Sequence, residues 1–312
     1  MKTLFLLASL LLLVAAPFFG QIDLPLDELM QPQSMAHQVF MQIRLPRVLL
    51  AFLVGGILSL GGLVFQVVFR NPMSTPYTLG VASGATLFTA IAIIAGLGTY
   101  SPLFAFVGAM MTVLILFAVA SRFGGYDPTA LLLVGIALGF FYAAALMVMY
   151  ALSTLQESYE ILRFTMGSLD IVGFGQIGIL TAAAVLLLLM MRYYKNAFKA
   201  LLVSYEFAFL QGIRVKKLSY TLLFGVSVAV GAAVSLTGPI GFVGLIIPHM
   251  LATLYRQSAE KLLMPSFFYG GVFLVLCDLI ARSLADATLP IGVVTSFVGA
   301  PFFIYLLLQS RK

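Results

Sequence analysis

Apolar stretches separated by short polar segments run through the whole chain. A helix needs roughly 20 apolar residues to cross the hydrocarbon layer of a membrane. Stretches of about that length, the eighth of them shorter, lie near residues 3–20, 46–68, 78–97, 102–120, 129–151, 176–193, 218–237, 243–256, 263–281 and 292–308. The pattern predicts an all-α membrane protein with ten transmembrane helices, and we expect a single transmembrane domain over residues 1–312.

The sequence FRNPMSTPYTLGVASGA, residues 69–85, places helix breakers between two of these stretches. Proline lacks the backbone N–H that a helix uses, and it disfavours helical backbone in the residue before it. Asn71-Pro72 and Thr75-Pro76 therefore predict that one helix ends here. We expect a shaped turn, and we expect the next helix to begin near Leu79.

Two loops are longer than a simple connection requires. Residues 194–217 combine apolar side chains with a basic frame, which predicts a short amphipathic helix. Residues 152–175 contain ESYEILRFTMGSLD, which predicts another short helix. The short stretch 243–256 follows the sequence TGPIGFVG, so we expect it to be partly unwound or tilted. Small residues at close spacing predict tight helix contacts. They are Gly55, Ser59, Gly62, Gly135 and Gly139.

The first apolar stretch imitates a secretory signal peptide. Lys2 precedes an apolar run that ends in the small residues Ala15 and Ala16, as a cleavage site would. Pro17 directly after that site argues against cleavage, and apolar residues continue through Phe19. We therefore expect an uncleaved first transmembrane helix.

Charged residues divide unevenly between the loops. With both termini in the cytoplasm, most of the 17 Lys and Arg residues fall in cytoplasmic segments, as the positive-inside rule requires. The outer segments keep Arg44, Arg47, Arg163 and Arg282, together with most of the acidic residues. The net charge of +6 is thus a topological signal, and it gives no reason to expect a nucleic-acid partner.

Residues that carry out catalysis are sparse. Charged residues make up 9% of the chain, against about a quarter in soluble globular proteins, and the mean hydropathy is +1.11. His37 and His249 lie in no cluster with metal-ligand spacing, and the sequence contains no G-x-x-x-x-G-K-[ST] nucleotide-binding loop. We expect a transport subunit rather than an enzyme, with no metal site. Any ATP hydrolysis would then belong to another chain.

Few ionisable residues fall inside the apolar stretches, where a buried charge is costly. Asp278 is four residues before Arg282, so the two side chains can share a helix face and pair. A proton- or sodium-driven carrier would need more buried carboxylates than this chain offers. The single cysteine, Cys277, permits no internal disulfide.

Five segments, taken in order and with their spacing, resemble the permeases of ABC importers for iron chelates, haem and vitamin B12. They are RLPR at 44–47, GGLVFQVVFRNPMSTPYTLGVASGA at 61–85, MGSL at 166–169, GPIGFVGLIIPH at 238–249 and LPIGVVTSFVGAPFFIYLLL at 289–308. The resemblance implies a ten-span subunit of the bacterial inner membrane that dimerises around a central pathway. It also implies a periplasmic substrate-binding protein and two cytoplasmic ATPase subunits, which would hold ATP and Mg, while this chain holds no cofactor.

The resemblance also implies site residues, some within these segments and others by their position between them. Binding-protein docking is expected at Arg44, Arg47 and Arg282, the cytoplasmic gate at Asn71, Met73 and Thr129, and ATPase coupling at Glu206, Ala208 and Gly212. For the arginines, the competing interpretation is pairing within the chain, with Asp278 or Asp286 for Arg282 and acidic residues of the 21–40 segment for Arg44. The coupling segment departs from the family pattern Gly-Glu-Glu, because it has Ser204-Tyr205-Glu206 instead.

The function class follows from both lines of reasoning. We expect the permease subunit of an importer for an iron–siderophore complex, haem or cobalamin, and the alternative is a secondary transporter or channel for a small solute. The absence of a repeated filter-like loop or a charged ring argues against a channel. The sequence does not select one chelate, nor a homodimer over a heterodimer.

Overall fold

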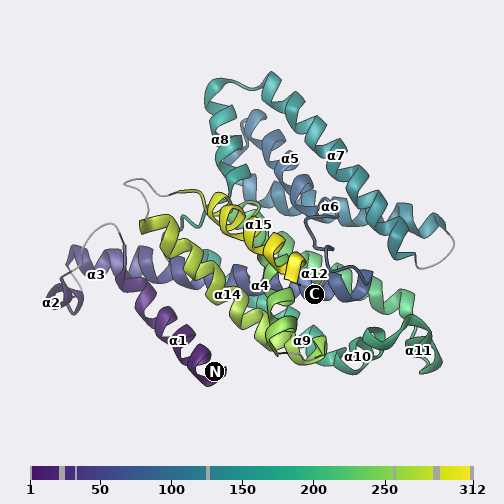
Figure 1. Cartoon of the computed structure of the whole chain (residues 1–312). Coiled ribbons are helices and arrows are strands. Elements are labelled where there is room, and N and C mark those ends of the chain that lie inside the picture. The colour runs from purple at the N-terminus through teal and green to yellow at the C-terminus, as the bar shows by residue number, and fades with distance from the viewer. Residues whose placement is uncertain are drawn as a thin grey trace.

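The computed structural model describes residues 2–20, 25–31, 34–123, 127–255, 258–283 and 289–309, and its regular elements in these ranges are all helices (Figure 1). The α-helices are α1 (Lys2–Ala15), α2 (Leu26–Leu29), α3 (Met35–Val39), α4 (Leu45–Phe69), α5 (Val81–Ile94), α6 (Ser101–Ala120), α7 (Pro128–Leu152), α8 (Leu155–Met166), α9 (Gly175–Tyr193), α10 (Lys195–Val203), α11 (Tyr205–Leu210), α12 (Val215–Thr237), α13 (Val243–Tyr255), α14 (Ala259–Ser283) and α15 (Ile291–Gln309). The prediction of an all-α protein is confirmed for this part of the chain.

Each apolar stretch singled out in the sequence coincides with one of these helices. Within the described ranges, six helical segments are long and apolar enough to cross a membrane: Met35–Phe69, Gly98–Val119, Pro128–Leu152, Gly175–Tyr193, Val215–Thr237 and Ala259–Ser283. Four shorter apolar helices, Phe5–Phe18, Val81–Ile94, Val243–Tyr255 and Ile291–Tyr305, account for the remaining stretches. The chain is therefore a multi-pass membrane protein, and a count of ten crossings stays a prediction.

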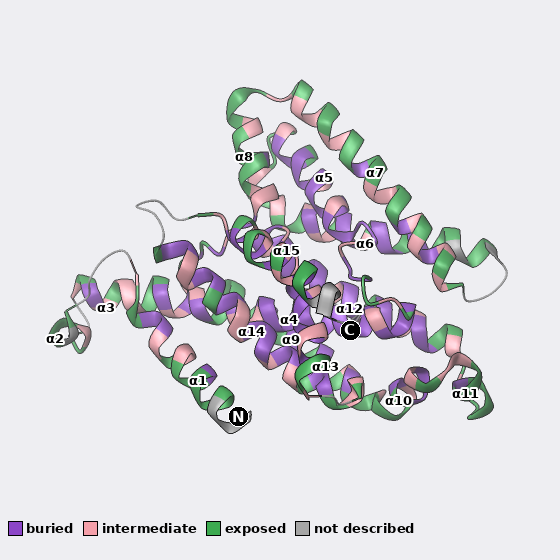
Figure 2. Cartoon of the chain, viewed as in Figure 1, coloured by how far each residue is buried: buried purple, intermediate pink, exposed green. Residues whose placement is uncertain are grey.

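Helix α4 forms the centre of the bundle, where α14, α13, α12 and α9 pack around it. Most of its residues from Val48 onward are buried (Figure 2). Glycines let the neighbouring backbones come close: a Cβ at Gly55 would collide with the carbonyl oxygen of Gly270, and one at Gly62 with that of Gly244. The predicted tight contacts on this helix are confirmed.

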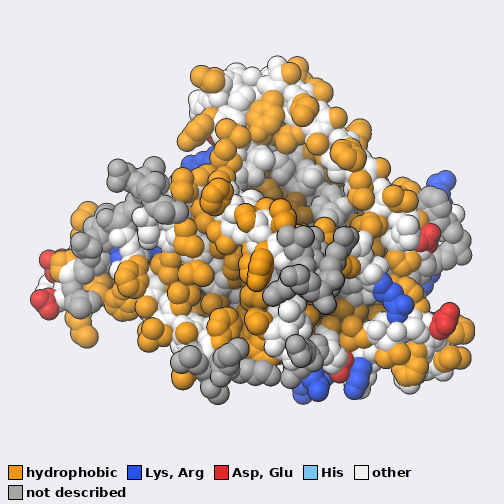
Figure 3. Space-filling view, viewed as in Figure 1, with side chains coloured by type: hydrophobic (Ala, Val, Ile, Leu, Met, Phe, Trp, Pro, Cys, Tyr) orange, Lys and Arg blue, Asp and Glu red, His pale blue; other side chains and the backbone are white. Residues whose placement is uncertain are grey.

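A second group of helices, α5 to α8, packs on one side of this centre, with α5 in contact with α6, α7 and α8. Gly135 of α7 packs against Leu79, which confirms another predicted close contact. Much of α7 is exposed (Figure 2), and hydrophobic side chains cover most of the face seen in Figure 3. Lys, Arg, Asp and Glu gather toward the edges of that face, as expected where apolar surface meets lipid and charges meet water.

The turn after α4 confirms the interpretation of the proline-rich segment. The helix ends at Phe69, and Arg70 adopts left-handed backbone angles (φ 50°, ψ 34°). The next helix begins at Val81, slightly later than predicted, because Thr75 and Thr78 form a turn of their own in which the Thr75 amide donates to Thr78 Oγ1 at 3.0 Å.

The two long loops also contain helices. Residues 152–175 form α8, as predicted, and Thr154 and Glu157 cap its start reciprocally. Residues 194–217 form two helices rather than one, α10 and α11. The eighth stretch forms α13, which is only 13 residues long and helical throughout, so the expected unwinding is not found within it. Non-helical backbone over residues 238–242 precedes it instead, and a tilt stays a prediction.

Close packing of α4 predicts the effect of one substitution. Gly62→Leu should prevent the folded bundle from forming, because the new side chain has no space against the backbone of Gly244. The measurement is the yield of monodisperse protein in mild detergent and its thermal unfolding. Gly178→Ala on α9 is the matched control, because a Cβ there meets nothing within 4 Å. Equal yield and stability for both variants would contradict the packing described here.

Candidate functional site

Charged side chains meet at the end of the bundle where α4 begins, which we call the Arg47 end. Arg47 Nε donates to Asp278 Oδ1 at 2.9 Å, and Arg282 pairs with the other carboxylate oxygen at 3.0 Å. Asp278 is fully buried, and its two arginines are almost so. A buried carboxylate is tolerated only when it is paired and hydrogen-bonded, so these contacts hold α14 to α4.

Backbone carbonyls after α1 bind the remaining guanidinium groups at this end. Arg44 donates to the carbonyl oxygen of Phe18 at 2.9 Å, and Arg282 donates to that of Phe19 at 3.1 Å. These carbonyls lie at the C-terminal end of a short 3-10 helix, Ala16–Phe18, that extends α1. The carbonyls at the end of a helix lack intrahelical partners and carry a partial negative charge, so cations are favoured there.

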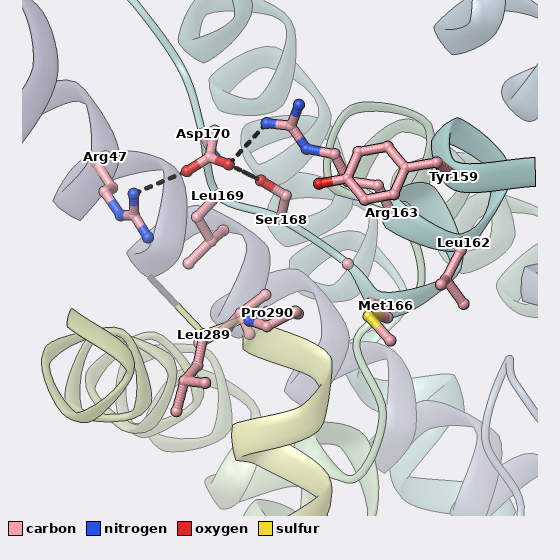
Figure 4. A pocket seen from close by; sticks show the side chains of 12 residues that line it. Arg47, Tyr159, Leu162, Arg163, Met166, Ser168, Leu169, Asp170, Leu289 and Pro290 are labelled. Carbon is pink, nitrogen blue, oxygen red and sulfur yellow. Dashed lines mark hydrogen bonds and ion pairs between the residues drawn. The ribbon is translucent and has the colours of Figure 1, made fainter. Parts of the chain in front are cut away.

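The Arg47 end also has an exposed part, a cavity of about 270 Å³ between α8 and the start of α15 (Figure 4). Asp170 bridges Arg47, at 2.9 Å, and Arg163, at 3.2 Å, and it accepts a hydrogen bond from the Ser168 hydroxyl at 2.7 Å. Partial burial raises the pKa of Asp170, but the Ser168 hydrogen bond and the two arginines outweigh it, so the pKa lies below its ordinary value. Asp170 is therefore ionised at neutral pH and connects α8 to α4.

The structure changes the interpretation of the three predicted docking arginines. Arg44 and Arg282 are 5% and 6% exposed, so little of either side chain is accessible from outside the chain. The predicted pair of Asp278 with Arg282 is confirmed. Asp286, the other candidate partner, lies outside the described residues. A docking role for the three arginines stays a prediction.

Sequence reasoning missed two residues of this end as members of the site. Arg163 is the exposed cation of the group, with a side chain that is 63% accessible, and Asp170 holds it beside Arg47. The sequence signals were weak: a cation on a segment assigned to the outer side, and an acid just after the MGSL sequence. No spacing rule connects position 170 to position 47.

The predicted gate residues lie at the opposite end of α4, which we call the Arg70 end, and at the start of α7. Asn71 Oδ1 accepts a hydrogen bond from the Met73 amide at 2.9 Å, so the two residues share one turn. Met73 is 44% exposed. Thr129 lies in the first turn of α7, where its amide donates to Asp127 at 2.8 Å. Asn71 also lines a cavity of about 350 Å³ that extends to α10, α13 and α14.

The predicted coupling residues are on and beside α11. Glu206 is exposed, and Gly212 adopts left-handed angles (φ 77°) that suit glycine where the chain leaves the helix. Ala208 is fully buried, so its side chain packs inside the chain, and Ile213 donates to its backbone carbonyl. A coupling role for the three residues stays a prediction. The most exposed apolar residues of this helix are Phe209 and Leu210, at 72% and 82%.

A third cavity, of about 760 Å³, is open and mostly apolar. It lies between the end of α8, the segment before α13, and α15, and its lining includes Tyr77, Met166 and Phe297. Phe297 is 81% exposed beside it. Among the described residues, no group of three or more His, Cys, Asp or Glu side chains could hold a metal ion.

Comparison with known proteins decides the family. The sequence profile of the FecCD transport family matches residues 6–309. The chain belongs to this family. A Helicobacter pylori protein, whose name gives it as a permease of an iron chelatin transport system, is 34% identical over 98% of this chain and 97% of its own length. A Yersinia pestis hemin transport system permease is 35% identical over 88% of this chain and 84% of its own.

A solved structure agrees with the family assignment. It is described as an inward-facing ABC transporter of the metal-chelate type, and it covers 98% of this chain and 99% of its own length with 28% identity and a TM-score of 0.88. A vitamin B12 import permease of Pectobacterium atrosepticum is 36% identical over 88% of this chain and 84% of its own. The resemblance found in the sequence is thus confirmed, and this FecCD family member is a transport permease and not an enzyme.

The buried charge cluster predicts a large loss of stability on one substitution. Asp278→Asn should lower the free energy of unfolding by about 3–5 kcal/mol, because it leaves Arg282 buried without a carboxylate and removes the buried one of the two carboxylates that Arg47 contacts. The measurement is thermal unfolding in detergent. Asp27→Asn, an exposed position on α2, is the control and should change little. A loss at position 278 no larger than that of the control would show that the cluster is not structural.

Proposed function

We propose that this chain is the permease subunit of an ABC importer that moves a metal chelate, such as an iron–siderophore complex, haem or cobalamin, into the cytoplasm. The observation that carries the proposal is the match of nearly the whole chain to one family of transport permeases with the same fold. The open apolar cavity beside α8 and α15 supports it, because a bulky chelate needs a wide surface of generic contacts. The nucleotide and its Mg belong to a partner ATPase.

The proposed arrangement has ten crossings of the bacterial inner membrane, with both termini in the cytoplasm. The Arg70 end, with the basic residues of α10 and the loop after α11, then faces the cytoplasm, and the Arg47 end faces the periplasm. Two copies of the chain form a dimer around the pathway, in which Asn71 and Met73 approach their own copies at the cytoplasmic gate. Thr129 joins them there.

A secondary transporter remains the alternative, and buried carboxylates are the feature that separates the two. Among the described residues, Asp278 is the fully buried carboxylate, and two arginines hold it. A proton carrier needs a carboxylate that can take up and release its proton during transport. A paired, structural carboxylate does not meet that need.

The ATPase contact is proposed on α11. Phe209 and Leu210 project from a six-residue helix whose other face, with Ala208, packs inside the chain. Arg214, Lys216 and Lys217 follow directly and are exposed. An apolar tip within a polar rim fits a groove on a partner protein, and movement of that partner would push α11 as a unit. Glu206 is the exposed acidic residue in the first turn of this helix, and Gly212 lies just after its end.

Binding-protein docking is proposed at the Arg47 end. Four arginines gather there around two aspartates. Arg163 is the exposed cation, and a carboxylate from the partner reaches it before Arg44, Arg47 and Arg282 behind it. An exposed pair at Arg163 contributes about 0.2–1 kcal/mol and mainly sets orientation and association rate.

The coupling surface gives a direct test. The double variant Phe209→Ala and Leu210→Ala should lose most ATP-driven uptake while the permease keeps its fold, because exposed side chains on α11 contribute to the contact and not to the core. The measurement is ATPase capture and uptake in proteoliposomes. Phe140→Ala on α7, which is 75% exposed, is the matched control. Unchanged capture by the double variant would move the contact elsewhere.

The function itself is tested on the assembled complex. The chain, purified in mild detergent from its own organism, should bring an ATPase with it, in equal copy number. In proteoliposomes, the matching binding protein is added on the periplasmic face of the complex. The complex should then transport one of the three chelate classes only when ATP is present on its cytoplasmic face. Uptake that follows a proton or sodium gradient without ATP would establish the secondary transporter instead.

A further inference from the structure

The end of α4 and the break between α10 and α11 touch through two side chains. Arg70 Nη2 donates to the carbonyl oxygen of Val203 at 3.0 Å, and its guanidinium carbon lies 4.5 Å from the centre of the Tyr205 ring. The Tyr205 hydroxyl donates in turn to the carbonyl oxygen of Val68. We call these four residues the clasp.

Each contact of the clasp supplies something that the local backbone lacks. The carbonyl of Val68 would accept from residue 72 in a continuing helix, but residue 72 is proline and has no N–H. The Tyr205 hydroxyl takes that place. Val203 is the last residue of α10, where a free helix carbonyl favours a cation, and the Arg70 guanidinium provides one.

The backbone at Arg70 depends on these contacts. Arg70 is one of two described non-glycine residues with positive φ, and left-handed backbone is unfavourable for a residue with a side chain. Such a conformation persists where the surroundings determine it, and it is often found where a segment moves. Arg70 directly precedes Asn71, so the same residue holds the helix end and starts the turn with the predicted gate residues.

On the other side of the clasp, Tyr205 starts α11. Ser204, between the two helices, accepts a hydrogen bond from the Phe207 amide at 2.8 Å and caps α11. The clasp therefore holds the N-terminus of the helix whose tip carries Phe209 and Leu210. Leu201 and Leu202 of α10 line the same cavity as Asn71 and Pro72, so the two segments also share a packed wall.

We propose that Arg70 and Tyr205 are positioning residues that transmit displacement of α11 to the turn of residues 70–73. The Arg70 guanidinium lies over the Tyr205 ring and donates to one backbone carbonyl, and the Tyr205 hydroxyl donates to another. Together these contacts fix both distance and direction, whereas a single exposed ion pair would fix neither. When α11 moves, the turn moves with it and the helical part of α4 stays in place. This assignment rests on the proposed function, because it takes the ATPase as the source of the displacement.

The departure from the family pattern sharpens the assignment. This chain has Ser204-Tyr205-Glu206 where the resembling permeases commonly have Gly-Glu-Glu, so an aromatic ring stands where an acid is usual. An acid at that position could pair with Arg70 through charge alone. Tyr205→Glu should therefore keep a contact with Arg70, now as an ion pair in place of the cation–ring contact. Tyr205→Leu should lose the contact.

The first test uses the isolated protein and needs no transport. Spin labels on cysteines at positions 73 and 211, in a Cys277→Ala background, report the distance between the turn and α11. With Tyr205 present the distance distribution should be narrow, and Tyr205→Leu should broaden it. Tyr100→Leu, an exposed tyrosine before α6, is the control and should leave the distribution narrow. A distribution that is unchanged in Tyr205→Leu would overturn the proposal.

The second test measures substrate imported per ATP hydrolysed by the assembled complex. Tyr205→Leu should lower this ratio by at least about fivefold while ATP hydrolysis continues, because the contact is lost. Tyr205→Phe, which keeps the ring and loses the hydroxyl, should lie between Tyr205→Leu and the unmodified chain. Tyr205→Glu should recover most of the ratio, and should fail to do so when combined with Arg70→Gln.

The outcomes separate the two levels of the inference. Equal ratios in all Tyr205 variants would overturn the clasp even if uptake is ATP-driven. If the unmodified complex imports nothing with ATP, the proposed function fails, while the spin-label distances still decide whether the clasp holds the two segments together. If Tyr205→Leu does not fold, Tyr205→Phe and Tyr205→Glu with and without Arg70→Gln give the same comparison.

Discussion

Backbone-to-backbone packing of α4 is the constraint on which the rest of the structure depends. Lipid tails are as apolar as leucine, so helices in a membrane gain little from hiding apolar side chains and associate where small residues allow close approach. Gly55 against Gly270 and Gly62 against Gly244 provide that approach to α14 and α13. With α4 fixed in this way, its first and last turns place Arg47 at one end of the bundle and Arg70 at the other.

Three arginines solve the same physical problem at those ends. Where a helix stops, its last carbonyls have no intrahelical partner and need another donor. Arg44 and Arg282 donate to the carbonyls of Phe18 and Phe19 after α1, and Arg70 donates to that of Val203 after α10. Each contact joins a helix end to α4 or α14, so the arginines supply the hydrogen-bond donors that the terminal carbonyls would otherwise lack.

The features that could be predicted from the sequence are those that depend on residues close together in the chain. Apolar runs and prolines located the helices and the turn after Phe69, and a spacing of four residues located the pair of Asp278 with Arg282. The partner of Arg47 could not be found in this way, because Asp278 is 231 positions away. The backbone carbonyls that accept from Arg44, Arg70 and Arg282 could not be predicted from the sequence either, because every residue has a carbonyl. The burial of Ala208 could not be found from the sequence either, because a six-residue helix has too few turns to show which face packs.

The two ends of α4 differ in how easily they can rearrange. At the Arg47 end, separating Asp278 from its arginines would expose a buried charge to an apolar surrounding, which costs about 3–5 kcal/mol. At the Arg70 end, the contacts are a cation over a ring and hydrogen bonds near the surface, and a cation–ring contact of that kind contributes about 0.5–1 kcal/mol when exposed. The 25 residues of α4 separate these ends by about 37 Å. A displacement that reaches the turn of residues 70–73 can therefore be absorbed by non-helical backbone without opening the charge cluster, so one end can stay assembled while the other moves.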